Sequence, residues 1–310
     1  MSDSELLGAD SSTYANVFSY LGLPLSRRID DTVDAVVMGV PYDLATSARA
    51  GARSGPSAIR QASVQLRWEE KRWPWRFSLR DATNIVDYGD LSFGAGDSAG
   101  MVKSVVEHAD RIFSAGKFLL TFGGDHFISL PLLRAAARQH KRIALVHFDA
   151  HTDTEKSDLE FYHGSMFDVA MREKLFDPAH AIQVGIRTEY DYDSHVLSVL
   201  DAAWANEHST EETIAKIVAR SGGLPVYLSI DIDCLDPAFA PGTGTPVAGG
   251  LSSDRLLRIV RGLSSLNIIA ADIMEVAPAY DSSEITALAA ATLGLELLYL
   301  NAAANRRLKE

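Results

Sequence analysis

Short apolar runs rich in β-branched and aromatic residues alternate with longer amphipathic patterns along most of this chain. The runs predict strands at 35–40, 84–86, 118–122, 143–148, 181–186, 226–230 and 268–273. The segments between them have helical periodicity, at 56–67, 97–115, 129–139, 165–175, 210–220, 252–264 and 283–304. Several runs are apolar at consecutive positions, as in strands that are buried on both faces. The alternation predicts an α/β fold in which helices cover a parallel sheet.

Composition supports one globular unit. The chain has 310 residues, 47% of them hydrophobic and 23% charged, and such values are typical of soluble globular proteins. We find no internal repeat, low-complexity tract or Pro/Gly/Ser-rich linker. We therefore predict a single domain over 1–310, in which residues 1–30 form a loosely packed N-terminal segment.

The net charge of -12 argues against a nucleic-acid partner, because phosphate binding requires clustered Lys and Arg. It is compatible with a small cationic substrate. Cys234 is the one cysteine, so an internal disulfide is impossible, as is common in a reducing compartment such as the cytoplasm. We see no signal peptide and no apolar run near the ~18 residues of a membrane span, so we expect no membrane partner.

Three polar segments directly follow predicted strands. They are Gly123-Gly-Asp-His126, Asp149-Ala-His-Thr-Asp153 and Asp231-Ile-Asp-Cys-Leu-Asp-Pro237. Parallel sheets bind ligands beyond the carboxyl ends of their strands, which is where these segments would lie. We expect them to meet in one crevice.

The spacing within these segments favours convergent side chains. Residues two apart project to the same side of an extended strand, so the middle segment can direct two carboxylates and an imidazole into the crevice. The last segment repeats this spacing, and the first adds a second imidazole. The resulting set contains His126, Asp149, His151, Asp153, Asp231 and Asp233.

Buried carboxylates at this density require compensating positive charge, because an unpaired buried ion costs several kcal/mol. Oxygen ligands with two imidazoles suit a hard divalent ion, and six ligands exceed the three of a typical catalytic zinc. The set is right for two ions about 3.5–4 Å apart. We expect manganese, with magnesium or zinc as alternatives. The other interpretation is that these acids are solvated turn and cap residues.

Two such ions would lower the pKa of a water between them toward ~7 and so provide hydroxide. The four Asp residues balance the charge of two divalent ions, so hydroxide leaves the cluster with one net negative charge. Such a site attracts a cationic substrate.

The motifs resemble those of the ureohydrolase family, which includes arginases, agmatinases and guanidinobutyrases. The similarity extends from Gly39-Val-Pro-Tyr-Asp43 through Phe239–Val247 and Met274–Asp281 to the last helix. The overall sequence looks most similar to that of bacterial agmatinases.

The resemblance implies a three-layer α/β/α fold with a mostly parallel sheet of about eight strands, and a homo-oligomer, usually a trimer or hexamer. It also implies two manganese ions per subunit. One would be bound by His126, Asp149, Asp153 and Asp231, and the other by Asp149, His151, Asp231 and Asp233.

The resemblance assigns further roles beside the metal ligands. Glu275 matches the family glutamate that binds the guanidinium, a group whose planar fork suits a bidentate carboxylate. Thr245 matches a threonine near the substrate, and His163 matches a histidine that shuttles protons. Asp153 would accept a hydrogen bond from the hydroxide. A strand-end acid, a turn residue and a loop histidine are the alternatives for the first three. His147 is expected to belong to its strand.

The expected reaction is hydrolysis of agmatine to putrescine and urea. The arginase-type serine/asparagine pattern is absent from the loop at 154–162, where Glu155, Asp158 and Glu160 could form an acidic mouth for an ammonium group. Lys156 keeps 4-guanidinobutyrate open as the substrate. Two rival functions are amide hydrolysis on the same fold and an inactive binding protein. Glu275 argues against the first, and the complete ligand set argues against the second.

Overall fold

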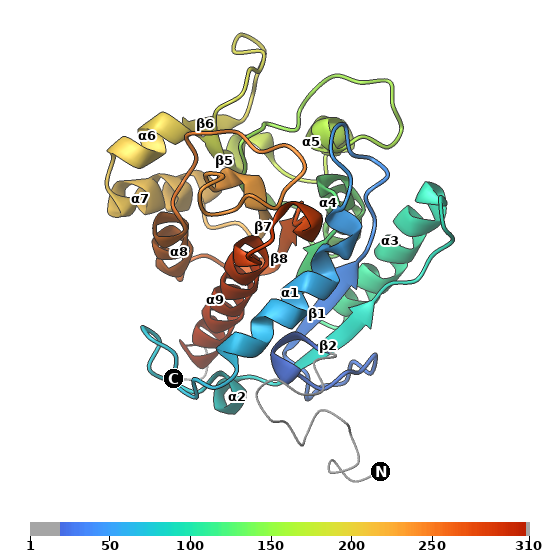
Figure 1. Ribbon diagram of the computed structural model, residues 1–310, viewed down its shortest axis with the longest axis vertical. Coiled ribbons are helices and arrows are strands. Elements are labelled where there is room, and N and C mark those ends of the chain that lie inside the picture. Colours follow the sequence, from blue (N-terminus) through green and yellow to red (C-terminus); the bar gives the residue numbers. More distant parts are fainter. Residues whose placement is uncertain (1–18, 308–310) are drawn as a thin grey trace.

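The computed structural model describes residues 19–307, with side chains through residue 305. This range contains one eight-stranded sheet in which every strand pairing is parallel, with the order β2-β1-β3-β8-β7-β4-β5-β6 (Figure 1). The strands are β1 Ala35–Val40, β2 Ile85–Asp90, β3 Phe118–Gly123, β4 Ala144–Phe148, β5 Ala181–Ile186, β6 Ser198–Asp201, β7 Val226–Asp231 and β8 Ile268–Met274.

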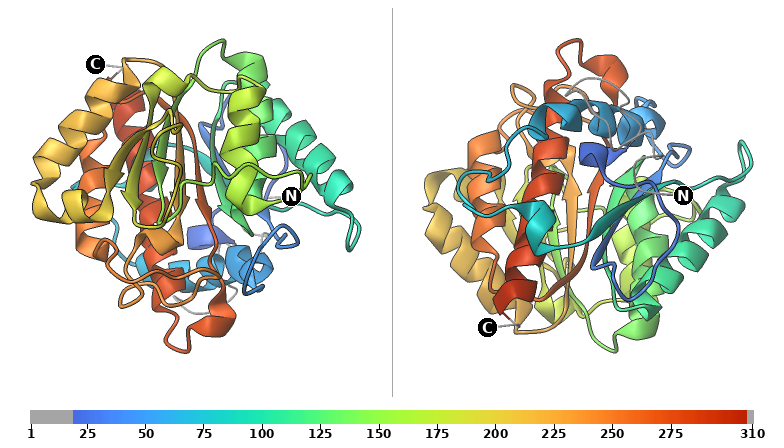
Figure 2. Two further views of the ribbon diagram at one scale, coloured as in Figure 1. Left: turned by 90° about the horizontal axis from the view of Figure 1, so that it is seen from above. Right: turned by 90° about the horizontal axis from the view of Figure 1, so that it is seen from below.

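Helices cover both faces of this sheet, as Figure 2 shows from two ends. They are α1 Gly55–Ser63, α2 Leu79–Ala82, α3 Ser98–Ser114, α4 Ser129–Gln139, α5 Met166–Arg172, α6 Ala202–Glu207, α7 Thr210–Ser221, α8 Ser253–Gly262 and α9 Ile285–Arg307. On one face α9 packs against α1 and α8, and on the other α4 packs against α3 and α5. The predicted three-layer α/β/α fold is confirmed.

Alternation along the buried strands creates two hydrophobic cores. In β3, Phe118, Leu120 and Phe122 belong to the core that includes residues of α9. Leu119 between them belongs to the core under α3 and α4. Both faces of the strand are therefore apolar, which is why the central strands appear in the sequence as nearly continuous apolar runs.

The seven predicted strands are all present, and the structure adds an eighth. Strand β6 is four residues long, lies at the edge of the sheet beyond β5 and is only partly buried. Its residues Ser198–Asp201 carry too short and too polar a pattern to be recognised as a strand from sequence.

The expectation that no apolar run approaches the length of a membrane span is wrong for α9. Residues Ile285–Asn305 are long and apolar enough to cross a membrane by length and composition, and 72% of that span is buried inside the protein. The helix packs against α1 and α8, so its apolar character reflects its position in the core.

The N-terminal segment can be followed from residue 19. Residues 1–18 of the predicted loose segment lie outside the described residues. Tyr20 is fully buried, and its hydroxyl donates a 2.6 Å hydrogen bond to the Ala291 carbonyl on α9. Its amide donates to Asp87 Oδ2 at 2.7 Å, so the chain is firmly attached to the sheet at this point.

Candidate active site

The four central strands, β3, β8, β7 and β4, are neighbours and end at the same edge of the sheet. Every polar segment predicted from the sequence follows one of them. The residues at this edge are His126 after β3, Asp149, His151 and Asp153 after β4, Asp231 and Asp233 at the end of β7, and Glu275 after β8. Sheet order therefore brings together residues that are far apart in the chain.

The turn after β3 places His126 through a very close backbone contact. A Cβ atom on Gly124 would lie 1.8 Å from the carbonyl oxygen of Tyr42, so a side chain cannot fit there. The next amide, that of Asp125, donates to the same carbonyl at 2.8 Å. The glycine is thus required for the approach that fixes this turn.

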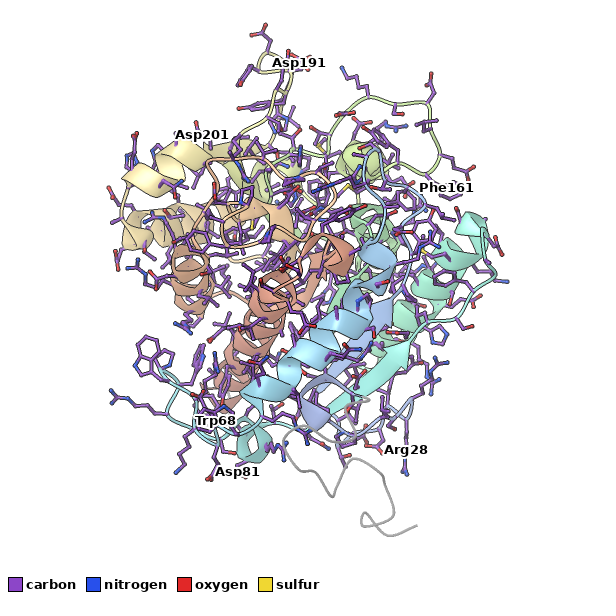
Figure 3. All side chains as sticks on the ribbon, in the orientation of Figure 1. Arg28, Trp68, Asp81, Phe161, Asp191 and Asp201 are labelled. Carbon is purple, nitrogen blue, oxygen red and sulfur yellow. The ribbon has the colours of Figure 1, made fainter. Side chains whose placement is uncertain are left out.

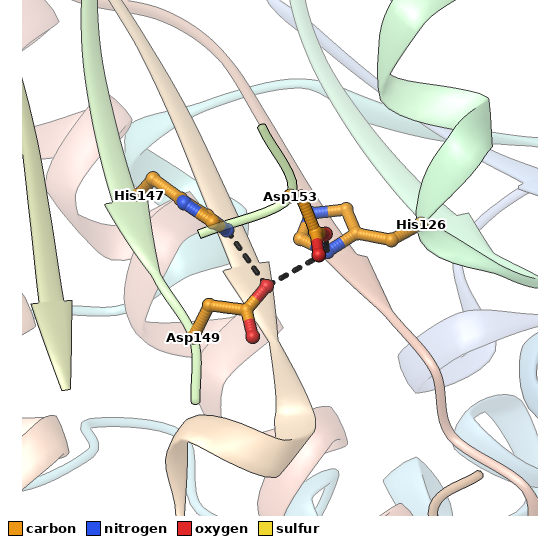
Figure 4. A group of neighbouring side chains, drawn as sticks. All are labelled: His126, His147, Asp149 and Asp153. Carbon is orange, nitrogen blue, oxygen red and sulfur yellow. Dashed lines mark hydrogen bonds and ion pairs between the residues drawn. The ribbon is translucent and has the colours of Figure 1, made fainter. Parts of the chain in front are cut away.

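Three carboxylates surround one nitrogen of His126, and we call this group the inner half of the site. The Nδ1 atom lies 3.1 Å from Asp149 Oδ2, 3.2 Å from Asp153 Oδ2 and 3.1 Å from Asp231 Oδ2. Figure 4 shows two of these carboxylates turned toward the ring. One ring nitrogen carries at most one hydrogen, so it cannot donate to all three.

The other nitrogen of His126 is fixed by a buried hydrogen-bond chain. The Ser229 hydroxyl donates to Asp272 Oδ1 at 2.6 Å, and it lies 2.8 Å from His126 Nε2. Because the hydroxyl hydrogen is already used, Nε2 must be the donor to Ser229. Nδ1 is therefore the nitrogen that a cation among the three carboxylates would use.

His151 and Asp233 form the outer half of the site together with Asp149. The Nδ1 atom of His151 lies 3.3 Å from Asp149 Oδ1 and 3.2 Å from Asp233 Oδ2. Thr245 Oγ1 donates to Asp233 Oδ2 at 3.2 Å. Asp149 presents one oxygen to each half, as a bridging ligand would. Asp231 directs Oδ2 to the inner half, while its Oδ1 accepts the amide of Asp233 at 2.8 Å.

The charges in this cluster are poorly balanced by the protein itself. Burial, with the nearby charges of Asp233 and Asp149, raises the pKa of Asp231 well above its usual value. Burial acts in the same direction on Asp149, but His147, His126 and His151 together hold the pKa of that carboxyl well below its usual range. Added positive charge would relieve this conflict, and groups of these residues lie close enough to hold a metal ion. The donor set therefore fits a divalent metal.

Glu275 and His163 lie beside the cluster in a hydrogen-bonded pair. Glu275 Oε1 accepts the His126 amide at 2.8 Å and His163 Nδ1 at 2.9 Å, whereas Oε2 is buried and has no hydrogen-bond partner among the described residues. His163 Nε2 accepts a hydrogen bond from the Ser47 amide at 3.0 Å and lies 2.8 Å from the Ser47 hydroxyl. Glu275 thus has one oxygen left for a ligand.

Two acids of the site have backbone conformations that L-residues rarely adopt. The φ angle is +52° at Asp153 and +63° at Glu275. A non-glycine residue in this region costs about 1–3 kcal/mol, so the surrounding structure must hold it there. Strain of this kind concentrates at functional sites, which agrees with the position of both carboxylates.

A cavity of about 360 Å³ opens beside the outer half of the site. Its walls include His151 and Asp153, four further acids and one lysine. The acids are Glu155, Asp168, Glu189 and Asp191, and the lysine is Lys156. Asp191 lies near the tip of a projecting loop (Figure 3). Of the three acids expected at the mouth, Glu155 is among the lining residues. The remaining acids of the cavity come from α5 (Asp168) and from the loop after β5 (Glu189 and Asp191).

Sequence comparison identifies the family. A model of the arginase family matches residues 33–299. The chain belongs to the arginase family. It is 56% identical over 296 residues to the agmatinase of Serratia proteamaculans, an alignment that covers 95% of this chain and 96% of that protein. The agmatinase of Edwardsiella ictaluri is 57% identical, with 95% and 97% covered.

Solved structures give the same result for this arginase-family chain. A hypothetical agmatinase from Burkholderia thailandensis superposes with a TM-score of 0.91 at 50% identity, covering 96% of this chain and 94% of that one. A proclavaminate amidino hydrolase from Streptomyces clavuligerus has a TM-score of 0.90 at 39% identity, with 95% and 100% covered. The resemblance to ureohydrolases is confirmed.

Several partners of the site were not foreseen from the sequence. They are Ser47, Gln183, Ser229 and Asp272, together with the cavity acids Asp168, Glu189 and Asp191. The position of Ser229 could have been predicted from the sequence, because it precedes Asp231 by two residues in β7 and so projects to the same side of the strand. The others depend on contacts between separate elements.

Proposed function

We propose that this chain is a metal-dependent ureohydrolase that converts agmatine and water to putrescine and urea. The single observation that carries the reaction type is the unpartnered Glu275 Oε2 beside the six-ligand cluster. The near full-length similarity to agmatinases supports agmatine as the substrate. We also propose two Mn²⁺ ions per subunit, a cytoplasmic location and a homo-oligomer, either a trimer or a hexamer.

Six residues would hold the ions in two overlapping sets. His126, Asp149, Asp153 and Asp231 form one set, and Asp149, His151, Asp231 and Asp233 form the other. Two bound divalent ions would supply hydroxide near neutral pH by lowering the pKa of water. A carboxylate-rich set with two imidazoles agrees with manganese.

Glu275 would orient the guanidinium of the substrate. Its Oε1 already accepts two hydrogen bonds from the protein, so the substrate N–H groups have Oε2 as their acceptor. A buried carboxylate oxygen without a donor is costly, and a guanidinium N–H removes that cost. Glu275 therefore holds the electrophilic carbon next to the cluster, with Thr245 close to the outer half.

The balance of the reaction is one C–O bond formed, one C–N bond broken and one proton delivered to the departing amine. His163 is suited to carry this proton. Although burial opposes its charged form, the hydrogen bond and charge of Glu275 raise the pKa of His163 to about 9. Asp153, within the inner half, would accept a hydrogen bond from the attacking oxygen.

The cavity supports a cationic tail on the substrate. Four of its side chains beyond the metal ligands are acidic, and one, Lys156, is basic. An ammonium such as that of agmatine is favoured by this balance. Lys156 is the feature that would suit a carboxylate, so 4-guanidinobutyrate is the second candidate substrate.

The test compares urea release from agmatine, arginine and 4-guanidinobutyrate by manganese-loaded protein. We expect agmatine to lead by orders of magnitude. If 4-guanidinobutyrate leads, the reaction type stands and the interpretation of the cavity is wrong. If two metals are bound and none of the three releases urea, the reaction class itself is wrong.

A further inference from the structure

Four side chains form a continuous hydrogen-bonded chain from the cavity wall to the metal cluster. His195 lines the cavity, and its Nε2 lies 2.8 Å from Gln183 Oε1. Gln183 Nε2 lies 2.9 Å from His147 Nδ1, and His147 Nε2 lies 2.8 Å from Asp149 Oδ2. Gln183, His147 and Asp149 are completely buried. The reaction proposed above uses neither Gln183 nor His147.

The donors and acceptors between Gln183, His147 and Asp149 can be assigned from one backbone contact. Gln183 Nε2 lies 2.7 Å from the Thr152 carbonyl oxygen, which can only accept, so this end of the amide is the nitrogen. Its second hydrogen then points at His147 Nδ1, which must accept it. The hydrogen of His147 is thereby on Nε2, where it is donated to Asp149.

This arrangement distinguishes His147 from the metal ligands. By distance alone, His147 belongs to a group with His126, Asp149 and Asp153 that could hold a metal ion (Figure 4). However, its Nδ1 lone pair accepts the Gln183 amide and its Nε2 carries a hydrogen. Both ring nitrogens are therefore engaged in hydrogen bonds. The ring fixes Oδ2 of Asp149, the carboxylate shared by the two halves.

We propose that Gln183 is a positioning residue of the metal centre, which acts through His147 to orient Asp149. The inference rests on the metal site of the proposed function and is independent of the identity of the substrate. Groups that fix metal ligands from behind typically contribute about 10–100-fold in metal affinity. Gln183 is thus expected to influence metal binding without touching a metal or a substrate.

The main experiment measures Mn²⁺ affinity by calorimetric titration of metal-free protein. Gln183→Met keeps the length of the side chain and removes its hydrogen bonds, and we expect affinity to fall about 10–100-fold. His147→Phe removes the donor to Asp149 and should have a comparable or larger effect. The double variant should bind no more weakly than His147→Phe alone, because Gln183 acts only through the imidazole.

His195→Phe is the matched control. It removes the hydrogen bond at the amide oxygen of Gln183 and leaves both bonds of the amide nitrogen in place. Its Mn²⁺ affinity should stay close to that of the wild-type protein. A loss equal to that of Gln183→Met would show that packing around the amide matters and would overturn the proposal, as would additive effects in the double variant.

A measurement on the unaltered protein keeps the proposal testable if a variant fails to fold. Nitrogen-15 NMR of the metal-free wild-type protein should show the ring hydrogen of His147 on Nε2. Finding it on Nδ1 would refute the hydrogen-bond directions. If wild-type protein binds no metal at all, the proposed function fails; if it binds metal and Gln183→Met binds equally well, only this inference fails.

Discussion

The inner and outer halves of the site are built from similar residues but meet the solvent differently. In the inner half the side chain of His126 is completely buried, and Ser229 and Asp272 fix its ring from behind. In the outer half the side chain of His151 is 28% exposed and forms part of the cavity wall. The imidazole of the inner half is thus held by buried protein groups, whereas the imidazole of the outer half reaches the cavity.

One carboxylate contacts both halves of the site, the buried one and the accessible one. Asp149 directs Oδ2 toward the buried half and Oδ1 toward the open half. The backbone amide of His151 donates a hydrogen bond of 2.6 Å to that same Oδ1. The position of Asp149 therefore links the buried half to the accessible one, and changes there should have the largest consequences.

The largest effect is expected for Asp149→Ala. Alanine removes both carboxylate oxygens, so both proposed ions lose a ligand. Loss of one partner of a buried charge pair costs about 3–5 kcal/mol, or roughly 10²–10⁴ in affinity. Elemental analysis after dialysis should find both ions reduced, and activity should fall with them. Retention of one full equivalent of metal would contradict a shared role for Asp149.

Substitutions in one half should separate the two ions. His126→Asn and His151→Asn are each expected to lower bound manganese from about two to about one per chain, as proposed for overlapping ligand sets. Electron paramagnetic resonance can distinguish a manganese pair from a single ion. If either variant loses all of its metal, the halves are not separate sites.

Protons compete with metal in both halves, so affinity should rise with pH. Burial opposes protonation of His151, yet Asp149 and Asp233 raise its pKa from 6.5 to about 12 in the metal-free protein. An ion in the outer half must therefore displace a proton. Titration calorimetry in buffers of different ionisation enthalpy should detect release of at least about one proton per chain at pH 7.5.

The same shift has a consequence for the metal-free protein. A histidine with a raised pKa stabilises the fold fully below its unfolded pKa of 6.5, and this stability is lost as pH rises toward about 12. Metal-free protein should thus become less stable from pH 7 upward relative to the metal-loaded form. Thermal unfolding of both forms across this range would measure the difference, and a constant gap would contradict it.

The smallest effect is expected at the far end of the cavity. Asp191 is exposed, and an exposed charge pair contributes about 0.2–1 kcal/mol. Asp191→Asn should raise the KM for agmatine by up to about fivefold with little change in kcat, because it weakens binding of the substrate and of the transition state equally. The increase should shrink at high salt.

Asp193→Asn is a matched control, because Asp193 is exposed in the same loop and is not among the residues lining the cavity. It should leave the KM unchanged. If both variants raise the KM equally, the effect comes from net charge and not from the cavity.

The sequence contained most of the fold because its central strands are apolar on both faces. The six proposed metal ligands could also be assigned to one edge of the sheet, since strand ends and a spacing of two place them there without knowledge of the sheet order. The short edge strand β6 was missed because Ser198–Asp201 lacks a strong pattern. Gln183 and Asp272 were missed because a polar residue inside a strand acquires a role only when its neighbour is known.

The lining of the cavity was the part of the site that could least be predicted from sequence. The loop after Asp153 offered three candidate acids, of which Glu155 lines the cavity, while Asp168 comes from α5, and Glu189 and Asp191 come from the loop after β5. Spacing along one segment carries no information on which loops meet across a sheet edge.

The positive φ angles at Asp153 and Glu275 set a limit on how robust this enzyme can become. Glycine at either position would relieve strain of about 1–3 kcal/mol, and this gain is large against the total stability of a typical domain. Stabilising substitutions at these two positions would therefore delete carboxylates that the proposed reaction uses. Selection for heat resistance alone would accept such changes, whereas selection that also scores urea release would favour relief of strain elsewhere, for example at Lys174 or Arg76.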